Sequence, residues 1–530
     1  MPVNSTMKHY FLFLVFGSLS LGVNAQQVDD ETLLNNLKAH VKFLADDKLE
    51  GRRTGTKGEK TAADYIKKNF KKAGLASLGD GFIQEFDVNE GKVVGSKTSL
   101  TVNDKTVPAD AYFPMAWSPS GKFNVPASAM KLIDVSKLVS DNAHNPHFDL
   151  ENAIRENTGT GTSLIVLYNS SNTADNLKFN RNDKNATASI PVIYLKDRSL
   201  LPDFRETKKV KLRVDISNSS RKGRNVIGFI NNNAAHTIVL GAHFDHLGYG
   251  EDRNSLYAGS DRQIHNGADD NASGTAALIE LGSMLKKYGP KQNNYILVAF
   301  SGEELGLYGS KYFTEHSPVP LTGINYMINM DMVGRLDSTK GLTVGGYGTS
   351  PAWSSAVTSE KIRISFDSSG SGPSDHTSFY RKDIPVLFFF TGSHQDYHKP
   401  SDDAHLVNYE GQKEIVKLIY SVIEKTSGAG RLSFLKTREP VMARTSFKVS
   451  LGIMPDYTFS GTGVKVDGVS DGRPAQKAGI KTGDVVTKLG NHVITDVQTY
   501  MEALSKFNKG ETVTVEVDRA GSKLSMPLTF

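Results

Sequence analysis

The sequence predicts an α/β protein with a mostly parallel central sheet flanked by helices, a small β-rich insert domain and a C-terminal β+α domain. From residue 225 onward, short continuous apolar stretches alternate with amphipathic helical patterns, which is typical of parallel strands covered on both faces. Residues 105–221 differ, with short strand-like stretches among many Asn, Ser and Pro residues. A polar stretch at 426–445 precedes a last unit, 446–530, with many short strands and one helical pattern.

Composition limits the possible functions. The chain has 530 residues, no cysteine and a formal net charge of +5. This length fits two to four domains. Without cysteine there is no disulfide and no thiol chemistry, so a metal site must use His, Asp and Glu. The slight charge, without a dense Lys/Arg run, argues against nucleic acid as a partner.

The N-terminus has the pattern of a secretory signal peptide. Lys8 precedes an apolar run at residues 10–21, and small residues follow up to Ala25. The run is shorter than the roughly 20 residues that span a bilayer, although a retained anchor helix is the alternative. We therefore expect residues 1–25 to direct export to the periplasm or medium, with no stable membrane insertion after cleavage.

The main domain is expected in two parts, residues 26–104 and 222–425. In the first part, residues 31–74 show helical spacing with Gly74 placed to end the second helix, and residues 82–88 alternate as a strand. In the second part, the expected strands are 225–230, 237–241, 295–300, 326–330 and 386–390, and the expected helices are 274–288 and 409–424.

Acidic and histidine side chains follow these strands or open the first of these helices. The clusters are His243 with Asp245, Asp269 with Asp270, Glu303 with Glu304, Asp331, and Tyr397 with His398. Functional residues of open α/β sheets gather at the carboxyl ends of strands. Each cluster alone has a structural reading, such as a helix cap for the vicinal aspartates. Together, the His, Asp and Glu residues form a ligand set suited to two Zn²⁺ ions that share a bridging carboxylate.

In combination, these motifs resemble the co-catalytic dizinc aminopeptidase family, which includes bacterial leucyl aminopeptidases, glutamate carboxypeptidase and the transferrin-receptor ectodomain. The resemblance covers the N-terminal helices and residues 222–425. It implies the zinc exopeptidase fold and two Zn²⁺ per chain. The implied metal ligands are His243 and Asp331 for one zinc, Glu304 and His398 for the other, and Asp270 as the bridge.

The resemblance also implies roles beside the metals. Glu303 is the expected general base, Asp245 supports His243, and Tyr397 steadies the oxyanion. His246 and His265 match no ligand position of the family, so they are left out of the predicted set. Asp375 and His376 are read as supporting structure, with substrate contact as the lesser alternative.

Two accessory domains are implied as well. The insert at 105–221 looks like a protease-associated domain, on position and on its strands at 163–168 and 190–195. Residues 446–530 resemble a PDZ domain, with a carboxylate-binding loop at 450–453, a turn signature at 474–484 and a groove helix at 496–507. A C-terminal peptide could bind there as an added strand. The alternative is a packing domain with an idle groove.

The resulting functional hypothesis is an exported dizinc exopeptidase acting on peptides, an aminopeptidase that removes N-terminal residues. Three alternatives remain open. They are a carboxypeptidase of the same family, a one-zinc glutaminyl cyclase, and a catalytically idle receptor or scaffold that binds peptides through its PDZ domain. The polar segment 426–445 is expected to be a linker at which truncation exposes little core.

Overall fold

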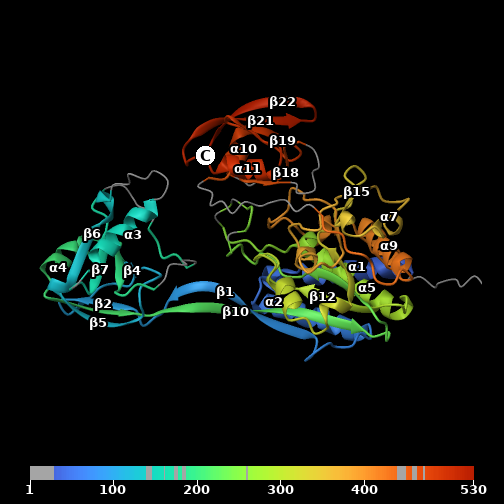
Figure 1. The fold of residues 1–530 in the computed structure, drawn as a ribbon, viewed down its shortest axis with the longest axis horizontal. Coiled ribbons are helices and arrows are strands. Elements are labelled where there is room, and N and C mark those ends of the chain that lie inside the picture. Colours follow the sequence, from blue (N-terminus) through green and yellow to red (C-terminus); the bar gives the residue numbers. More distant parts are fainter. Residues whose placement is uncertain are drawn as a thin grey trace, which may run out of the picture.

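The computed structural model describes residues 29–138, 146–159, 161–171, 177–181, 187–252, 254–257, 259, 261–437, 449–455, 462–469 and 472–530. The chain forms three lobes, with a main domain joined to an insert lobe by a long two-stranded stem and to a small C-terminal domain (Figure 1). The expected signal peptide, 1–25, lies outside the described residues. Among the described residues, no helix is long and apolar enough to cross a membrane.

The main domain is built on an eight-stranded sheet in the order β1-β10-β12-β11-β13-β16-β14-β15. Its strands are β1 (Ile83–Val94), β10 (Ile216–Ile230), β11 (Thr237–His243), β12 (Asn294–Phe300), β13 (Ile324–Met330), β14 (Leu342–Gly345), β15 (Ile364–Phe366) and β16 (Val386–Phe390). β12, β11, β13 and β16 run parallel in the middle, whereas β10 and β14 join them antiparallel. The predicted α/β class is confirmed, with a sheet whose parallel part is its centre.

Helices cover both faces of this sheet, which explains why its central strands are apolar throughout. Side chains alternate along a strand, so Leu240 packs with one set of helices and Val239 with the other. The first set consists of α1 (Asp30–Leu44), α2 (Lys57–Lys72), α5 (Gly274–Tyr288), α7 (Trp353–Ala356) and α9 (Tyr409–Thr426). The second consists of α6 (Tyr308–Glu315) and α8 (His376–Tyr380).

The insert lobe contains two four-stranded sheets, ordered β3-β2-β9-β5 and β4-β8-β7-β6. Its elements are β2 (Ser99–Val102), β3 (Lys105–Thr106), β4 (Tyr112–Pro114), β5 (Gly121–Pro126), β6 (Met130–Asp134), α3 (Pro146–Asn157), β7 (Leu164–Tyr168), β8 (Val192–Leu195), α4 (Leu201–Glu206) and β9 (Lys209–Val214). The lobe therefore begins before the expected boundary at residue 105, because β2 is hydrogen-bonded to β9. β1 and β10 pair over their lengths and form its stem.

The C-terminal domain has its own core and its own sheet, β17-β18-β19-β21-β22, with β20 paired to β19. Its elements are β17 (Ile453–Pro455), β18 (Val464–Val469), α10 (Pro474–Ala478), β19 (Val485–Leu489), β20 (His492–Val493), α11 (Val497–Leu504), β21 (Thr512–Arg519) and β22 (Ser522–Thr529). The expected helix at 496–507 corresponds to the shorter α11.

The expected linker 426–445 is in part docked on the main domain. Leu432 is buried in the main core, and its N–H donates to the Oδ1 of buried Asn325 at 2.8 Å, while the Asn325 amide donates to Gly430 O. Thr437 exchanges hydrogen bonds with the Tyr380 hydroxyl, and its Oγ1 accepts from Gly370 N. Three apolar residues among Gly, Ser, Lys, Arg and Thr are too weak a pattern to reveal this docking from sequence.

A buried arginine ties the N-terminal helices to the sheet. Arg52 is 0% exposed and donates to four main-chain carbonyls, at distances of 2.5 to 3.0 Å. The acceptors belong to Leu44, Phe244, Asn266 and Gly267. They lie at the end of α1, just after β11 and in the loop before α5, so one side chain joins three segments that are distant in sequence.

The docked segment leads to a prediction about truncation. A chain that ends after Gly430 loses the burial of Leu432 and leaves the Oδ1 of Asn325 without its donor, Leu432 N, whereas a chain that ends after Thr437 keeps both. We expect the shorter chain to be less stable by at least about 2 kcal/mol. Urea unfolding of the two truncated proteins, followed by tryptophan fluorescence, measures the difference. Equal midpoints would contradict the docking.

A second prediction concerns Arg52. Arg52→Met keeps much of the side-chain length but leaves three buried carbonyls without a donor, each at a cost of about 1–3 kcal/mol. The fourth, Gly267 O, keeps the N–H of Ala272 at 3.1 Å. We expect a loss of at least about 3 kcal/mol in the free energy of unfolding. Arg363→Met is the matched control, because Arg363 is exposed and donates only to Thr339 O at 3.1 Å. Similar small losses in both variants would show that Arg52 does not hold these segments together.

Candidate active site

The predicted site residues meet at the carboxyl edge of the parallel strands. His243 is the last residue of β11, Glu303 and Glu304 follow β12, Asp331 follows β13 and His398 follows β16. Asp270 lies in the turn before α5, where the Asp270–Asn271 peptide bond is cis. Because neighbouring parallel strands end at the same edge, residues as far apart in sequence as Asp270 and His398, 128 positions, come within contact distance.

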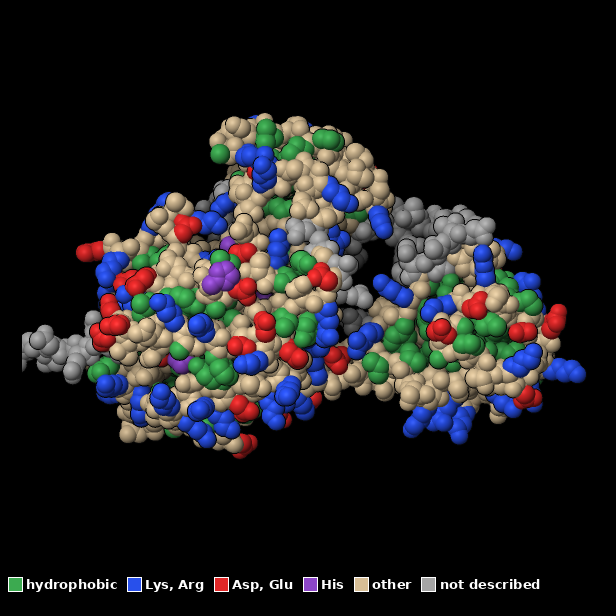
Figure 2. All heavy atoms as spheres, turned by 180° about the vertical axis from the view of Figure 1, so that it is seen from behind, with side chains coloured by type: hydrophobic (Ala, Val, Ile, Leu, Met, Phe, Trp, Pro, Cys, Tyr) green, Lys and Arg blue, Asp and Glu red, His purple; other side chains and the backbone are tan. Residues whose placement is uncertain are grey.

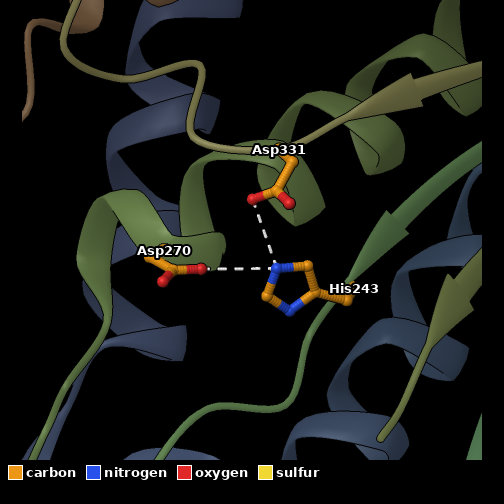
Figure 3. A group of neighbouring side chains, drawn as sticks. All are labelled: His243, Asp270 and Asp331. Atoms are coloured by element: carbon orange, nitrogen blue, oxygen red, sulfur yellow. Dashed lines mark hydrogen bonds and ion pairs between the residues drawn. The ribbon is translucent and has the colours of Figure 1, made fainter. Parts of the chain in front are cut away.

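Two carboxylates meet one nitrogen of His243. Its Nε2 lies 3.3 Å from Asp270 Oδ1 and 3.2 Å from Asp331 Oδ1, as Figure 3 shows. The imidazole is 1% exposed, and the other oxygen of Asp331 accepts a hydrogen bond from Ser374 Oγ at 2.8 Å. One Nε2–H cannot point at two carboxylate oxygens at once. This arrangement of His243, Asp270 and Asp331, called here the His243 half-site, suits a cation between the three groups.

His398 repeats the arrangement on the other side of Asp270. Its Nε2 lies 3.2 Å from Asp270 Oδ2 and 3.1 Å from Glu304 Oε2. Asp270, Glu304 and His398 are called here the His398 half-site. Asp270 thus turns one carboxylate oxygen toward each histidine, which is the geometry expected of a bridging ligand.

His246 also belongs to this cluster, although the sequence interpretation left it out. Its Nδ1 is 2.8 Å from Glu304 Oε1 and 3.9 Å from Asp270 Oδ2. The three residues offer atoms close enough to hold an ion together, as do His243, Asp270 and Asp331. The sequence carries no periodicity signal for His246, because β11 has already ended at His243 and the chain is turning.

The vicinal aspartates have different surroundings. Asp269 turns away from the two histidines, and its Oδ1 accepts from Gly334 N at 2.6 Å and from Ser273 Oγ. The main-chain N–H groups of Asp269 and Asp270 both donate to Asp402 Oδ2, at 2.9 and 3.0 Å. Asp402 therefore holds the turn that carries Asp270, a role that its position four residues after His398 could have suggested.

Glu303 and Asp245 are linked through the main chain. Asp245 is 0% exposed; its Oδ1 accepts from Glu303 N at 3.2 Å and its Oδ2 accepts from Thr54 Oγ1 at 2.8 Å. The Nδ1 of His243 is nearer to the main-chain oxygen of Asp245, at 3.2 Å, than to its carboxylate, at 3.7 Å.

The Tyr397 ring stacks on His398 with a centroid distance of 3.9 Å.

Burial and charge shift the pKa values of these groups in opposite directions. Burial lowers the pKa of His243 and of His398, but the carboxylates around them outweigh burial, so both pKa values lie well above the ordinary range. Burial raises the pKa of Glu303 well above its ordinary value, against a lowering by His243. At both histidines, the effect of the neighbouring carboxylates is therefore larger than that of burial.

The remaining residues considered from the sequence lie beside the half-sites. His265 is buried and bonded to Ser255 Oγ at 2.7 Å, and burial lowers its pKa to about 4. His376 stacks on Phe388, and burial lowers its pKa to about 3, whereas burial raises the pKa of Asp375 to about 7. None of the three belongs to a potential metal group among the described residues.

Comparison with known proteins finds a family match for each of two parts of the chain. Residues 225–423 match the model of peptidase family M28, and residues 438–529 match that of the PDZ domain. Aminopeptidase YwaD of Bacillus subtilis is 26% identical over 288 residues, which are 50% of this chain and 58% of the relative. A probable zinc metalloprotease of Pyrenophora tritici-repentis is 39% identical over 106 residues, 18% of this chain and 22% of the relative. The chain thus spans less than two thirds of each of these relatives.

Solved structures with a similar chain include the aminopeptidase from Aneurinibacillus sp. strain AM-1. That structure is 20% identical, with a TM-score of 0.44, and the match covers 79% of this chain and 97% of the other. A zinc aminopeptidase from Bacillus subtilis matches at 20% identity and a TM-score of 0.43, over 76% of this chain and 98% of the other. On these family matches, residues 225–423 match peptidase family M28, and residues 438–529 match a PDZ domain.

Proposed function

We propose that the protein is an exported zinc-dependent exopeptidase, an aminopeptidase that removes residues from the N-termini of peptides. The observation that carries this proposal is Asp270, whose two oxygens face His243 and His398 separately. The family matches and the aminopeptidase name of the Bacillus subtilis relative support it. Export rests on the signal-like pattern of residues 1–25.

The donor set fits two zinc ions. Imidazole nitrogen and carboxylate oxygen are ligands that Zn²⁺ accepts, and each half-site brings one histidine and two carboxylates to a common point. His243, Asp270 and Asp331 would hold one ion, and Asp270, Glu304 and His398 the other, with His246 against Glu304. When bound, two such ions would supply Lewis-acid activation of the peptide carbonyl and of the attacking water.

Glu303 is the residue proposed to move the proton. Its carboxyl group follows strand β12 directly before the ligand Glu304, and its main chain is fixed on Asp245. It would accept a proton from the attacking water and pass it to the leaving amine. Burial raises the pKa of Glu303, so its carboxylate binds a proton more readily than an exposed one. Tyr397, stacked on His398, would donate to the oxyanion.

Three arginines near the site favour an aminopeptidase over a carboxypeptidase. A carboxypeptidase needs a cation that grips the substrate's carboxylate. Arg52 instead donates to main-chain carbonyls, Arg53 donates to Asp252 and Arg335 faces Asp396. These guanidinium groups are already engaged by the chain's own acceptors, so none of the three is available to grip a substrate's carboxylate.

The insert and the PDZ domain are proposed to act on substrate choice. The insert retains its interpretation as a protease-associated domain. In the PDZ domain, Gly452 has φ +75° and donates to Ser450 Oγ at 3.0 Å, while Leu451 O accepts from Ala475 N. This loop is the proposed site for the carboxylate of a bound peptide.

The activity can be tested with peptides of matched sequence. The protein should hydrolyse a free aminoacyl peptide from its N-terminus and leave the N-acetylated form intact, as shown by mass spectrometry of the products. Glu303→Gln should lower kcat by about 10²–10⁴-fold, because it removes the proton acceptor and keeps the shape. Zinc content should not change in this variant. Release of C-terminal residues would support the carboxypeptidase, and loss of zinc would make Glu303 a ligand.

The PDZ proposal predicts a dependence on peptide length. A chain that ends after Thr437 should cleave a dipeptide as the full chain does but should have a higher KM for a ten-residue peptide. Gly452→Ala is the matched point variant, because an added Cβ would lie 2.3 Å from the Arg473 side chain and disturb the loop. Both effects should vanish when the ten-residue peptide is amidated at its C-terminus. An equal loss on both substrates would mean that the domain supports the main fold instead.

A further inference from the structure

The loop after β11 holds the His398 half-site from outside the sheet. The main-chain oxygen of Asn254 lies 2.8 Å from His398 Nδ1, and the side-chain amide of Asn254 donates to Glu304 O at 3.2 Å. Leu256 N donates to His398 O at 3.0 Å. One short segment thus contacts both the histidine and the glutamate of this half-site.

The contact with Asn254 determines which nitrogen of the neutral His398 ring carries the proton. A carbonyl oxygen can only accept, so the bond to Asn254 requires a proton on Nδ1 and leaves Nε2 with its lone pair in the neutral ring. Nε2 is the atom that faces Asp270 and Glu304. His398 also has φ +53°, a backbone conformation that is unfavourable for a non-glycine residue and persists where neighbouring groups enforce it.

The described contacts that orient the His243 half-site do not involve the segment at 254–256. The Nδ1 of His243 is bonded to the main-chain oxygen of Asp245, two residues away at the end of the same strand. Asp331 is supported by Ser374, which precedes α8. The two half-sites are therefore oriented by different parts of the chain.

An ion cluster anchors the loop that carries Asn254. Asp252 accepts two hydrogen bonds from Arg53, at 2.7 and 2.8 Å, and one from Arg221 at 3.0 Å. Both guanidinium groups are largely buried, with side-chain exposures of 18% and 10%. A bidentate, partly buried cluster of this kind is worth more than an exposed pair. Arg53, Asp252 and Arg221 are called here the latch.

The latch reaches the stem of the insert lobe. Arg221 lies on β10, and Glu90 on β1 faces Arg53 at 3.7 Å and Arg221 at 3.6 Å. Glu90 is the residue at which the β1–β10 pairing shifts register, between Asn89 and Gly91. A bulge of this kind turns a side chain away from the sheet face that it would occupy in a regular strand. Asp252 lies two positions before Asn254 in the sequence, so the stem and the latch hold the chain next to the segment 254–256 that contacts His398.

We propose that Arg53, Asp252 and Arg221 are positioning residues for the His398 half-site, so that the stem of the insert lobe sets the affinity of one zinc and not of the other. This inference rests on the two-zinc site proposed above. It predicts that weakening the ion pairs of the latch lets Asn254 shift. His398 and Glu304 then lose their fixed orientation, while His243 and Asp331 keep theirs. Groups that orient metal ligands typically change metal affinity by 10–100-fold.

The test is zinc titration of the metal-free full chain in competition with a chromogenic chelator. The unmodified protein should take up two zinc ions. Asp252→Asn, which keeps the shape and removes the charge, should weaken one binding step at least tenfold and leave the other within about twofold. Asp252→Glu should restore part of the loss. Asp87→Asn is the matched control, because Asp87 lies on the same stem and pairs with Lys222 in solvent.

Two backgrounds identify the affected half-site. In a His243→Ala chain, Asp252→Asn should weaken the zinc that remains; in a His398→Ala chain it should have no effect. Unchanged affinities in Asp252→Asn, or an equal loss in both steps together with a lower Tm, would overturn the latch proposal. Uptake of one zinc or none by the unmodified protein would instead overturn the two-zinc site, and the latch proposal with it.

Discussion

Buried negative charge at the carboxyl edge of the central sheet is the constraint that the surrounding structure has to satisfy. Asp245, Asp269, Asp270, Asp331 and Asp402 are all buried there. The positive charge of Arg52 compensates part of this negative charge, although its guanidinium group contacts no carboxylate among the described residues. Burial lowers its pKa to about 10, opposed by Asp270 and Asp245, so the guanidinium stays charged at neutral pH. Arg52 and these aspartates therefore stabilise each other electrostatically, because burying a charge costs more free energy when no opposite charge is near.

The two halves of the site are built by different means. One histidine is oriented within the strand that carries it, and the other is oriented by a loop from elsewhere in the chain. The first belongs to the rigid sheet, whereas the second lies in a left-handed backbone conformation beyond β16. A bridging carboxylate joins them, and its turn is held by Asp402 from the segment that follows His398. The position of Asp270 thus depends on both half-sites.

Much of the fold could be predicted from sequence because the central strands are buried on both faces and therefore apolar throughout. The same argument located the clusters at the strand ends, where the structure brings His243, Asp270, Glu304, Asp331 and His398 together. It could not reveal His246, since no periodicity applies once a strand has ended. Nor could it reveal Asn254, whose contact with His398 uses its main chain. The docked segment at 430–437 and the early start of the insert depend on partners distant in sequence.

The hydrogen bonds of Arg52 have a consequence for related chains. All four acceptors are main-chain carbonyls, so the contact places no demand on the side chains at Leu44, Phe244 or Asn266. Those positions can change without losing the contact, provided that the backbone keeps its path. In an alignment, Arg52 would therefore be invariant without any covarying partner. Methods that infer contacts from correlated substitutions would not detect the residue that joins the N-terminal helices to the sheet.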